Sequence, residues 1–189
     1  MTWLTTFLVL GAISPLFADC RSDEVPTGGK IDLHAATYED VGIGNTPAEM
    51  RDVFGAPPPS DEQGAQPLGA RQFRGPTGFR SWPDPNPGRD FVPPPVYRYP
   101  HVAFFDDGTG RISVVTVIAP GAATTEGVAI GDPLGSVEGV YPVRCGDEFG
   151  AGEPPYPACV GQLEADRWVW FGGDPIENIT VGRFPMRRG

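Results

Sequence analysis

An internal repeat is the feature that most limits how this chain of 189 residues can fold. Residues 42–55 read GIGNTPAEMRDVFG, and a looser form of the same phrase, AIGDPLGSVEGVYP, returns at 129–142. A second pair of segments also corresponds, because HVAFFDDGTGRISVVTV at 101–117 resembles RWVWFGGDPIENITV at 167–181. Similarity at two places in the same order predicts two copies of one structural unit.

The first copy of the phrase carries the signals of a short helix. Thr46 suits the N-cap, Pro47 suits the first helical position, and Glu49 completes a capping box with Thr46. Gly55, followed by prolines, predicts the helix end. The second copy predicts a second helix, with Asp132 as its N-cap. The apolar stripe expected to face the core consists of Met50, Val53 and Phe54 in the first copy, and of Val137, Val140 and Tyr141 in the second.

The segments 101–117 and 167–181 each predict a β-hairpin, because an apolar run, a turn rich in Gly and Asp and an alternating strand follow one another. Alternation along the strands assigns side chains to the two faces of the sheet. The face expected to lie under the helices carries Ala103, Phe105, Ile112, Val114, Val169, Phe171, Ile179 and Val181. The opposite face carries Phe104, Trp168 and Trp170, with Val102, Ser113 and Thr180. Its aromatic residues form a candidate recognition surface, unless the insertion at 56–96 or the other repeat covers them.

Together these patterns predict an α+β fold made of two repeats. Each repeat is a short helix plus an antiparallel β-hairpin, and the helices pack on one face of the sheet. The first repeat spans 19–120 and contains a Pro/Gly-rich insertion at 56–96, and the second spans 121–189. The two repeats are compatible with one pseudo-symmetric domain. The 26 glycines and 23 prolines require many turns and long irregular connections between the elements.

Residues 1–18 predict a signal peptide and therefore export to the cell envelope or the extracellular space. The apolar run from Trp3 to Ile13 is shorter than the ~20 residues that span a membrane, but it has the length of a signal peptide's apolar core. Cys20 follows shortly afterwards and is a candidate for lipid attachment. Asp19 occupies the place where bacterial lipoproteins carry a small residue, so an unmodified thiol is the competing interpretation.

Cys145 and Cys159 are separated by a Pro/Gly-rich loop, and in an exported protein this arrangement favours a disulfide. A metal site is the alternative. His34 and His101 are the two histidines of the chain, and neither has a partner at ligand spacing. The sequence therefore predicts a disulfide and no metal.

Charge and motifs exclude several classes of function. The net charge of −10 argues against a nucleic-acid partner, because binding to phosphates requires clustered cations. The sequence contains no nucleophile elbow, phosphate-binding loop or zinc-protease motif. We therefore expect a protein that is not an enzyme and carries no cofactor.

The phrase at 42–57, followed by a hairpin that contains FDDGTGRISVV, resembles the small α+β unit of the BamE (SmpA/OmlA) lipoproteins. A tandem of such units resembles the β-lactamase inhibitory protein family, in which two units form one concave sheet backed by helices. The resemblance implies an envelope-associated binding protein without enzymatic activity. Inhibition of β-lactamases is not implied, because no inhibitory contact residue can be matched. The insertion at 56–96 and the residue before Cys20 depart from the pattern.

The sequence thus leads to the hypothesis of a secreted or cell-envelope protein that binds another protein. Phe104, Trp168 and Trp170 are the residues expected to make the contact. The alternative is a structural envelope lipoprotein attached through Cys20, and a membrane is expected as a partner only through that anchor.

Overall fold

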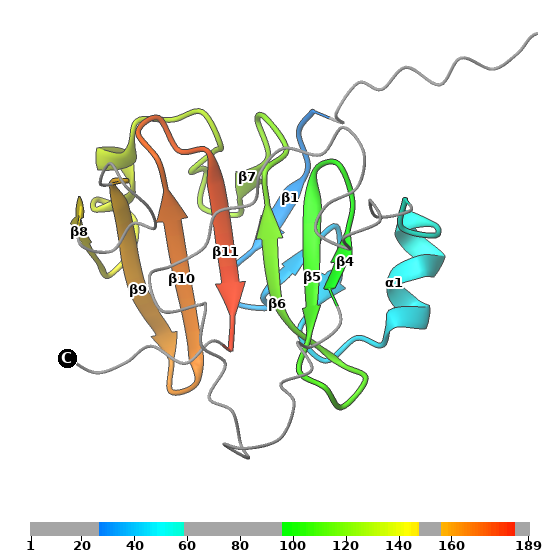
Figure 1. Cartoon of the computed structure of the whole chain (residues 1–189). Coiled ribbons are helices and arrows are strands. Elements are labelled where there is room, and N and C mark those ends of the chain that lie inside the picture. The colour runs from blue at the N-terminus through cyan, green and yellow to red at the C-terminus, as the bar shows by residue number, and fades with distance from the viewer. Residues whose placement is uncertain (1–26, 59–95, 148–155, 184–189) are drawn as a thin grey trace, which may run out of the picture.

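A computed structural model of the chain describes residues 27–58, 96–147 and 156–183, and these residues are mostly β-structure. They form a seven-stranded sheet and a four-stranded sheet that lie one behind the other (Figure 1). One α-helix and one 3-10 helix accompany the sheets in this part of the chain. The predicted α+β fold, with a helix from each repeat packed on one sheet face, is therefore wrong.

The larger sheet is antiparallel throughout and has the order β4-β5-β6-β11-β10-β9-β8. The predicted hairpins are confirmed as β5–β6 and β10–β11, and they pair with each other through β6 and β11. At this seam the hydroxyl oxygens of Thr116 and Thr180 form a buried hydrogen bond of 2.9 Å. The strands are β4 (Val96–Arg98), β5 (Val102–Asp106), β6 (Ile112–Val117), β8 (Val143–Gly146), β9 (Ala158–Glu164), β10 (Arg167–Gly172) and β11 (Asn178–Gly182).

The smaller sheet has the order β3-β2-β1-β7 and is built from very short strands. They are β1 (Lys30–Asp32), β2 (Thr37–Tyr38), β3 (Val41–Gly42) and β7 (Ala123–Thr124). The strands β1, β2 and β3 pair antiparallel, whereas β1 and β7 pair in parallel. The parallel pair joins the first part of the chain to the part that follows the β5–β6 hairpin.

The predicted first helix is confirmed as α1 (Pro47–Phe54), with its cap at Thr46. The Thr46 hydroxyl accepts a hydrogen bond from the backbone N–H of Glu49 at 3.3 Å, and the Glu49 carboxylate accepts one from the backbone N–H of Thr46 at 2.7 Å. The bonds that the Glu49 carboxylate accepts from the backbone N–H and from the hydroxyl of Thr46 hold the pKa of Glu49 below its usual value. Gly55 ends the helix with a φ of 75°, and its N–H donates to the carbonyl of Arg51 at 2.8 Å.

Replacing Thr46 with alanine should lower the free energy of unfolding by about 1 kcal/mol, because the substitution leaves the N–H of Glu49 without its acceptor. Urea unfolding of the purified protein measures this change. Thr46→Ser keeps the hydroxyl and is the matched control, for which we expect a loss of a few tenths of a kcal/mol at most. Equal losses in the two variants would show that the cap hydrogen bond contributes nothing.

The predicted second helix is replaced by a single 3-10 turn, η1 (Leu134–Val137). Asp132 does not cap it, because its carboxylate accepts a hydrogen bond from the backbone N–H of Ala129 at 2.8 Å. The residue at the N-cap is Pro133, which makes no side-chain cap hydrogen bond. Gly135 and Gly139 also each cost an α-helix about 1 kcal/mol relative to alanine. This segment therefore lacks both the cap and the helix propensity of the first copy.

The predicted apolar stripes are also only partly confirmed. Met50 and Val137 are fully buried and Tyr141 is also buried, as expected. Val53 and Val140 are instead 57% and 44% exposed, although they occupy equivalent places in the repeated phrase. Each element is too short to bury more than a narrow strip, so these two side chains point to solvent.

The two copies of the phrase nevertheless make matching backbone contacts. Residues 44–45 exchange two hydrogen bonds with Ile112, at 2.8 and 2.9 Å. Residues 131–132, the equivalent pair in the second copy, exchange two hydrogen bonds with Ile176, both at 2.8 Å. In each copy, the residues just before the helical turn are hydrogen-bonded to a residue near the start of the second strand of the hairpin, which is β6 in the first copy and β11 in the second.

One hydrophobic core fills the space between the two sheets and draws on both halves of the chain. The smaller sheet, its β1–β2 turn and α1 contribute Ile31, Leu33, Tyr38, Val41 and Met50, and the larger sheet contributes Phe104, Val115, Val169, Phe171, Ile179 and Val181. We call the face of the larger sheet that lines this core the inner face, and the opposite one the outer face. No helix in the described ranges is long and apolar enough to cross a membrane.

Candidate functional site

Phe104 lies on the inner face, away from the two tryptophans. Residues directly opposite each other on neighbouring strands share a face, and Phe104 stands opposite Val115, which stands opposite Val181, which stands opposite Val169. Phe104 is fully buried in the core beside these residues. The prediction that it shares a surface with Trp168 and Trp170 is therefore wrong.

The error comes from a shift of one residue between the two hairpins. The similarity between the two segments places Phe105 in the position of Phe171, because each ends an apolar run. In the sheet, however, Phe104 and Phe171 both belong to the inner core, and Phe105 lies on the outer face. Because side chains alternate along a strand, a one-residue shift moves each of them to the other face.

Trp168 and Trp170 both lie on the outer face, as predicted, since they flank the inward-facing Val169 on β10. They belong to a second, smaller group of apolar residues, which we call the outer cluster. Its buried members are Val114, Tyr156, Ala158, Val160 and Trp170, and its partly buried members are Phe105 and Trp168.

Trp170 is the centre of the outer cluster and is 0% exposed. Its ring stacks on that of Tyr156, with centroids 6.1 Å apart and planes 28° apart. It also covers Gly172, where a Cβ atom would collide with the indole ring. Tyr156 is fixed in turn, because its hydroxyl donates to the Glu177 carboxylate at 3.0 Å. Trp170 is therefore a structural residue of the outer face.

Trp168 differs from Trp170 because it is only partly buried. It lies near the β9–β10 turn, directly opposite the exposed Gln162. Charged residues surround this end of the hairpin. They form two ion pairs, Arg167–Glu164 at 3.4 Å and Arg183–Asp166 at 2.8 Å. The partly exposed indole is thus bordered by polar and paired charged side chains.

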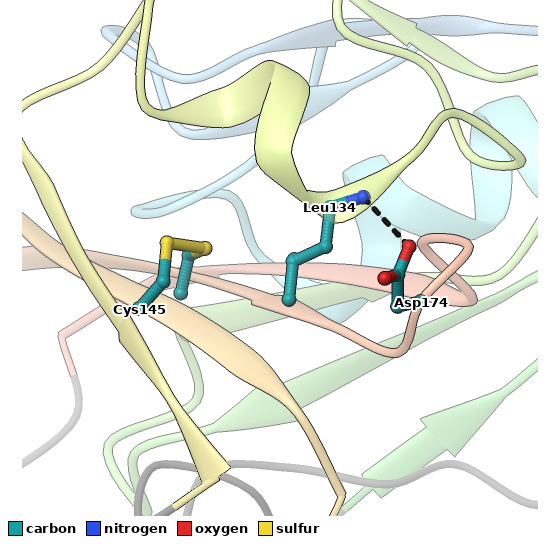
Figure 2. Close-up of a disulfide and its surroundings, with 4 residues drawn as sticks. Leu134, Cys145 and Asp174 are labelled. Carbon is teal, nitrogen blue, oxygen red and sulfur yellow. Dashed lines mark hydrogen bonds between the residues drawn. A yellow bond between two sulfur atoms is a disulfide. The ribbon is translucent and has the colours of Figure 1, made fainter.

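The predicted disulfide is confirmed and joins β8 to β9. Cys145 and Cys159 stand directly opposite each other on these antiparallel strands, and Cys159 is fully buried. Figure 2 shows the side chain of Leu134 pointing from η1 toward the sheet, between the disulfide and Asp174. The backbone N–H of Leu134 donates to the Asp174 carboxylate at 3.0 Å, which fixes η1 over this end of the sheet.

A polar cluster connects the β1–β2 loop with the turn after β7. Glu126 accepts hydrogen bonds from the hydroxyls of Tyr141 and Thr125, and the Nε2 atom of His34 lies 3.9 Å from its carboxylate. Burial alone would raise the pKa of Glu126, but these hydrogen bonds outweigh it and the pKa is lowered. Burial and the bond to Glu126 raise the pKa of Tyr141. The cluster thus holds the Glu126 carboxylate in place and favours its ionised form. Within the described ranges, no three His, Cys, Asp or Glu side chains are placed to hold a metal ion.

A third group of residues, which the sequence patterns do not predict, surrounds the end of α1. We call it the Phe54 cluster, because the ring of Phe54 contacts each of the other members. The ring centroids lie 6.0 Å from Tyr38, 5.5 Å from Tyr99, 5.9 Å from His101 and 5.2 Å from Phe104. The cluster joins three parts of the chain, namely Tyr38, Phe54 and the segment 99–104, so no local spacing in the sequence identifies all its members as neighbours.

Comparison of the chain with protein-family models, with curated proteins and with solved structures finds no match. The resemblance to the BamE and β-lactamase inhibitory protein families therefore stays a prediction. The predicted signal peptide at 1–18 and the lipid attachment site at Cys20 lie outside the described residues, as does most of the insertion at 56–96.

Proposed function

We propose that the protein is an exported, non-enzymatic binding protein that contacts another protein through Trp168. The observation that carries this proposal is the difference between the two tryptophans of β10. Trp170 is fully buried in the outer cluster, whereas Trp168, on the same face, packs against that cluster and is only partly buried. The exposed part of Trp168 is available for a partner.

The surroundings of Trp168 fit a contact with protein. Energetically dominant interface residues are enriched in tryptophan and arginine, and they are bordered by contacts that exclude water. Here the partly exposed indole lies beside Gln162, and the ion pair between Arg183 and Asp166 lies at the same end of the larger sheet. A flat apolar ring with hydrogen-bonding groups at its border suits a protein surface better than a charged small molecule.

The disulfide supports the location that we propose. Disulfides persist in oxidising compartments and are rare in the reducing cytosol, so the Cys145–Cys159 bond agrees with export. Whether the protein remains soluble or is attached through Cys20 does not change the proposed contact.

Replacing Trp168 with alanine should weaken binding to the partner about thirtyfold, because truncating a dominant interface residue costs about 2 kcal/mol or more. The partner is first captured in the native host with a photo-crosslinking phenylalanine analogue at position 162, because Gln162 is exposed and stands directly opposite Trp168, which stays in place. The affinity of the purified partner is then measured for the wild type and the variant by calorimetry.

Val140→Ala is the matched control, because Val140 is an exposed apolar residue in a different part of the fold. We expect it to leave the affinity unchanged, and a crosslinker at position 140 should capture no protein that the probe at 162 also captures. The proposal fails if Trp168→Ala binds as tightly as the wild type, or if the probe at 162 forms no crosslink in the host.

A further inference from the structure

The end of helix α1 is attached to the sheets through aromatic rings, one of which is an imidazole. His101 lies against Phe54 with ring centroids 5.9 Å apart, against Tyr38 at 5.9 Å and against Tyr99 at 6.5 Å. The hydroxyl of Tyr99 also donates to the carbonyl of Gly55, just past the helix, at 2.8 Å. The contacts of α1 with the sheets therefore include a group that can acquire a charge.

The imidazole is held where a second N–H would have no acceptor. The Nδ1 atom of His101 is inaccessible to solvent, and no hydrogen-bond partner for it exists in the described part of the chain. A neutral imidazole tolerates this at Nδ1, but an imidazolium carries a proton on both nitrogens. The backbone at His101 is fixed, because its carbonyl accepts a hydrogen bond from the N–H of Ile118 at 2.9 Å, so the ring can leave the site only by rotating about its side-chain bonds.

We propose that protonation of His101 loosens the packing of α1 against the sheets, so that mild acid releases the helix from the Phe54 cluster. The protonated ring must either remain buried with an unsatisfied Nδ1–H among aromatic side chains or turn toward water. Turning toward water separates it from Phe54, the last residue of α1, and from Tyr99, whose hydroxyl donates to the carbonyl of Gly55.

The groups around His101 set the direction of the effect. Burial lowers the pKa of His101 below its ordinary value of 6.5, and the carboxylate of Glu39, beside Tyr38, offsets part of that change. The tyrosines of the cluster do not titrate in this range, since burial raises the pKa of Tyr38 to about 12 and also raises that of Tyr99. On α1 itself, Arg51 and Asp52 are exposed and of opposite charge.

The packed state therefore binds the proton more weakly than the released state does. Packing of α1 is strongest above the ordinary histidine pKa of 6.5 and weakens as the pH falls through that value toward the lowered pKa of the packed state. A cation–π attraction to the surrounding rings would act in the opposite sense and would strengthen the packing in acid.

Hydrogen exchange of the amides at 50–55 tests the proposal on the full-length protein between pH 7.5 and pH 5. After correction for intrinsic exchange, we expect their protection to fall by about threefold or more in the wild type, and to stay constant in His101→Phe. His34→Gln is the matched control, because His34 is the second of the two histidines and its side chain is 75% exposed. This control should behave like the wild type.

Titration of the His101 ring by NMR in the wild type provides a second measurement that does not depend on how the variant folds. Protection that stays constant or rises in acid would overturn the proposal. So would a fall in His101→Phe as large as in the wild type, or a His101 ring that titrates above its ordinary pKa.

Discussion

Replacing Trp170 with alanine should lower the free energy of unfolding by about 3–5 kcal/mol, the usual cost of truncating a fully buried tryptophan. Trp170 is 0% exposed, stacks on Tyr156 and covers Gly172. The alanine variant loses the burial of the indole and leaves a cavity between the remaining members of the outer cluster. Because a domain of this size is stable by about 5–15 kcal/mol, such a loss removes much of the total.

Trp168→Ala is the matched control for this prediction. It removes the same side chain from the same strand and the same face, two residues away, but from a partly exposed position. We expect it to cost about 1 kcal/mol or less, because less apolar area returns to water. Urea unfolding of both variants measures the two free energies. Equal losses would show that the two indoles are equivalent and would remove the distinction on which the proposed binding role of Trp168 rests.

The parts of the fold that the sequence predicts are those determined by neighbouring residues. The cap at Thr46 and the turns of the two hairpins depend on residues a few positions apart, and all are present as expected. The disulfide was predictable for a similar reason, since the chain offers a Pro/Gly-rich loop between Cys145 and Cys159.

The parts that the sequence does not predict depend on residues that are distant along the chain. Strands of two or three residues, such as β2 and β7, carry no recognisable alternation, and β7 is placed by its parallel pairing with β1. The second helix is a separate case, because Pro133 stands at its N-cap and offers no side-chain hydrogen bond. The side chain of Asp132 instead accepts from the N–H of Ala129, as that of Asn45 accepts from the N–H of Gly42 in the first copy.

The candidate site was half predicted for the same reason. Trp168 and Trp170 are neighbours on one strand, so alternation placed them correctly on one face. Phe104 belongs to another hairpin, so its face depends on the register between the two hairpins. The sequence similarity predicts a register that is wrong by one residue, which places Phe104 on the opposite face. Nor could alternation separate the buried Trp170 from the partly exposed Trp168, because both point to the same side.

Removing the Cys145–Cys159 bond should lower the free energy of unfolding by about 3 kcal/mol. The bond joins residues 14 apart in sequence, and closing a loop of about 15 residues restricts the unfolded chain by roughly that amount. The test is urea unfolding of the double variant Cys145→Ala/Cys159→Ala beside the wild type. Alanine is preferred to serine because Cys159 is fully buried, where a hydroxyl would need a partner.

Adding a reductant separates the effect of losing the disulfide bond from the effect of replacing the two cysteine side chains with alanine. The wild type in the presence of a reductant should approach the stability of the double variant, whereas the double variant itself should not respond. Cys20→Ser is the matched control and should retain the full response, because the remaining cysteine of the chain takes no part in this bond. A wild type whose stability is the same with and without reductant, once mass spectrometry shows the bond reduced, would contradict the prediction.

Removing the disulfide should lower the protection of amides from hydrogen exchange unevenly over the larger sheet. Strand β8 ends the order of strands that the structure describes, and it pairs with β9 alone among them. Within the native state the disulfide fixes this four-residue strand at the register in which Cys145 faces Cys159. Without the bond, amides at 143–146 should lose protection from hydrogen exchange before those of β10 and β11, because strands inside the sheet open only with the core. Uniform loss of protection across all three strands would instead place the effect of the bond in the unfolded chain alone.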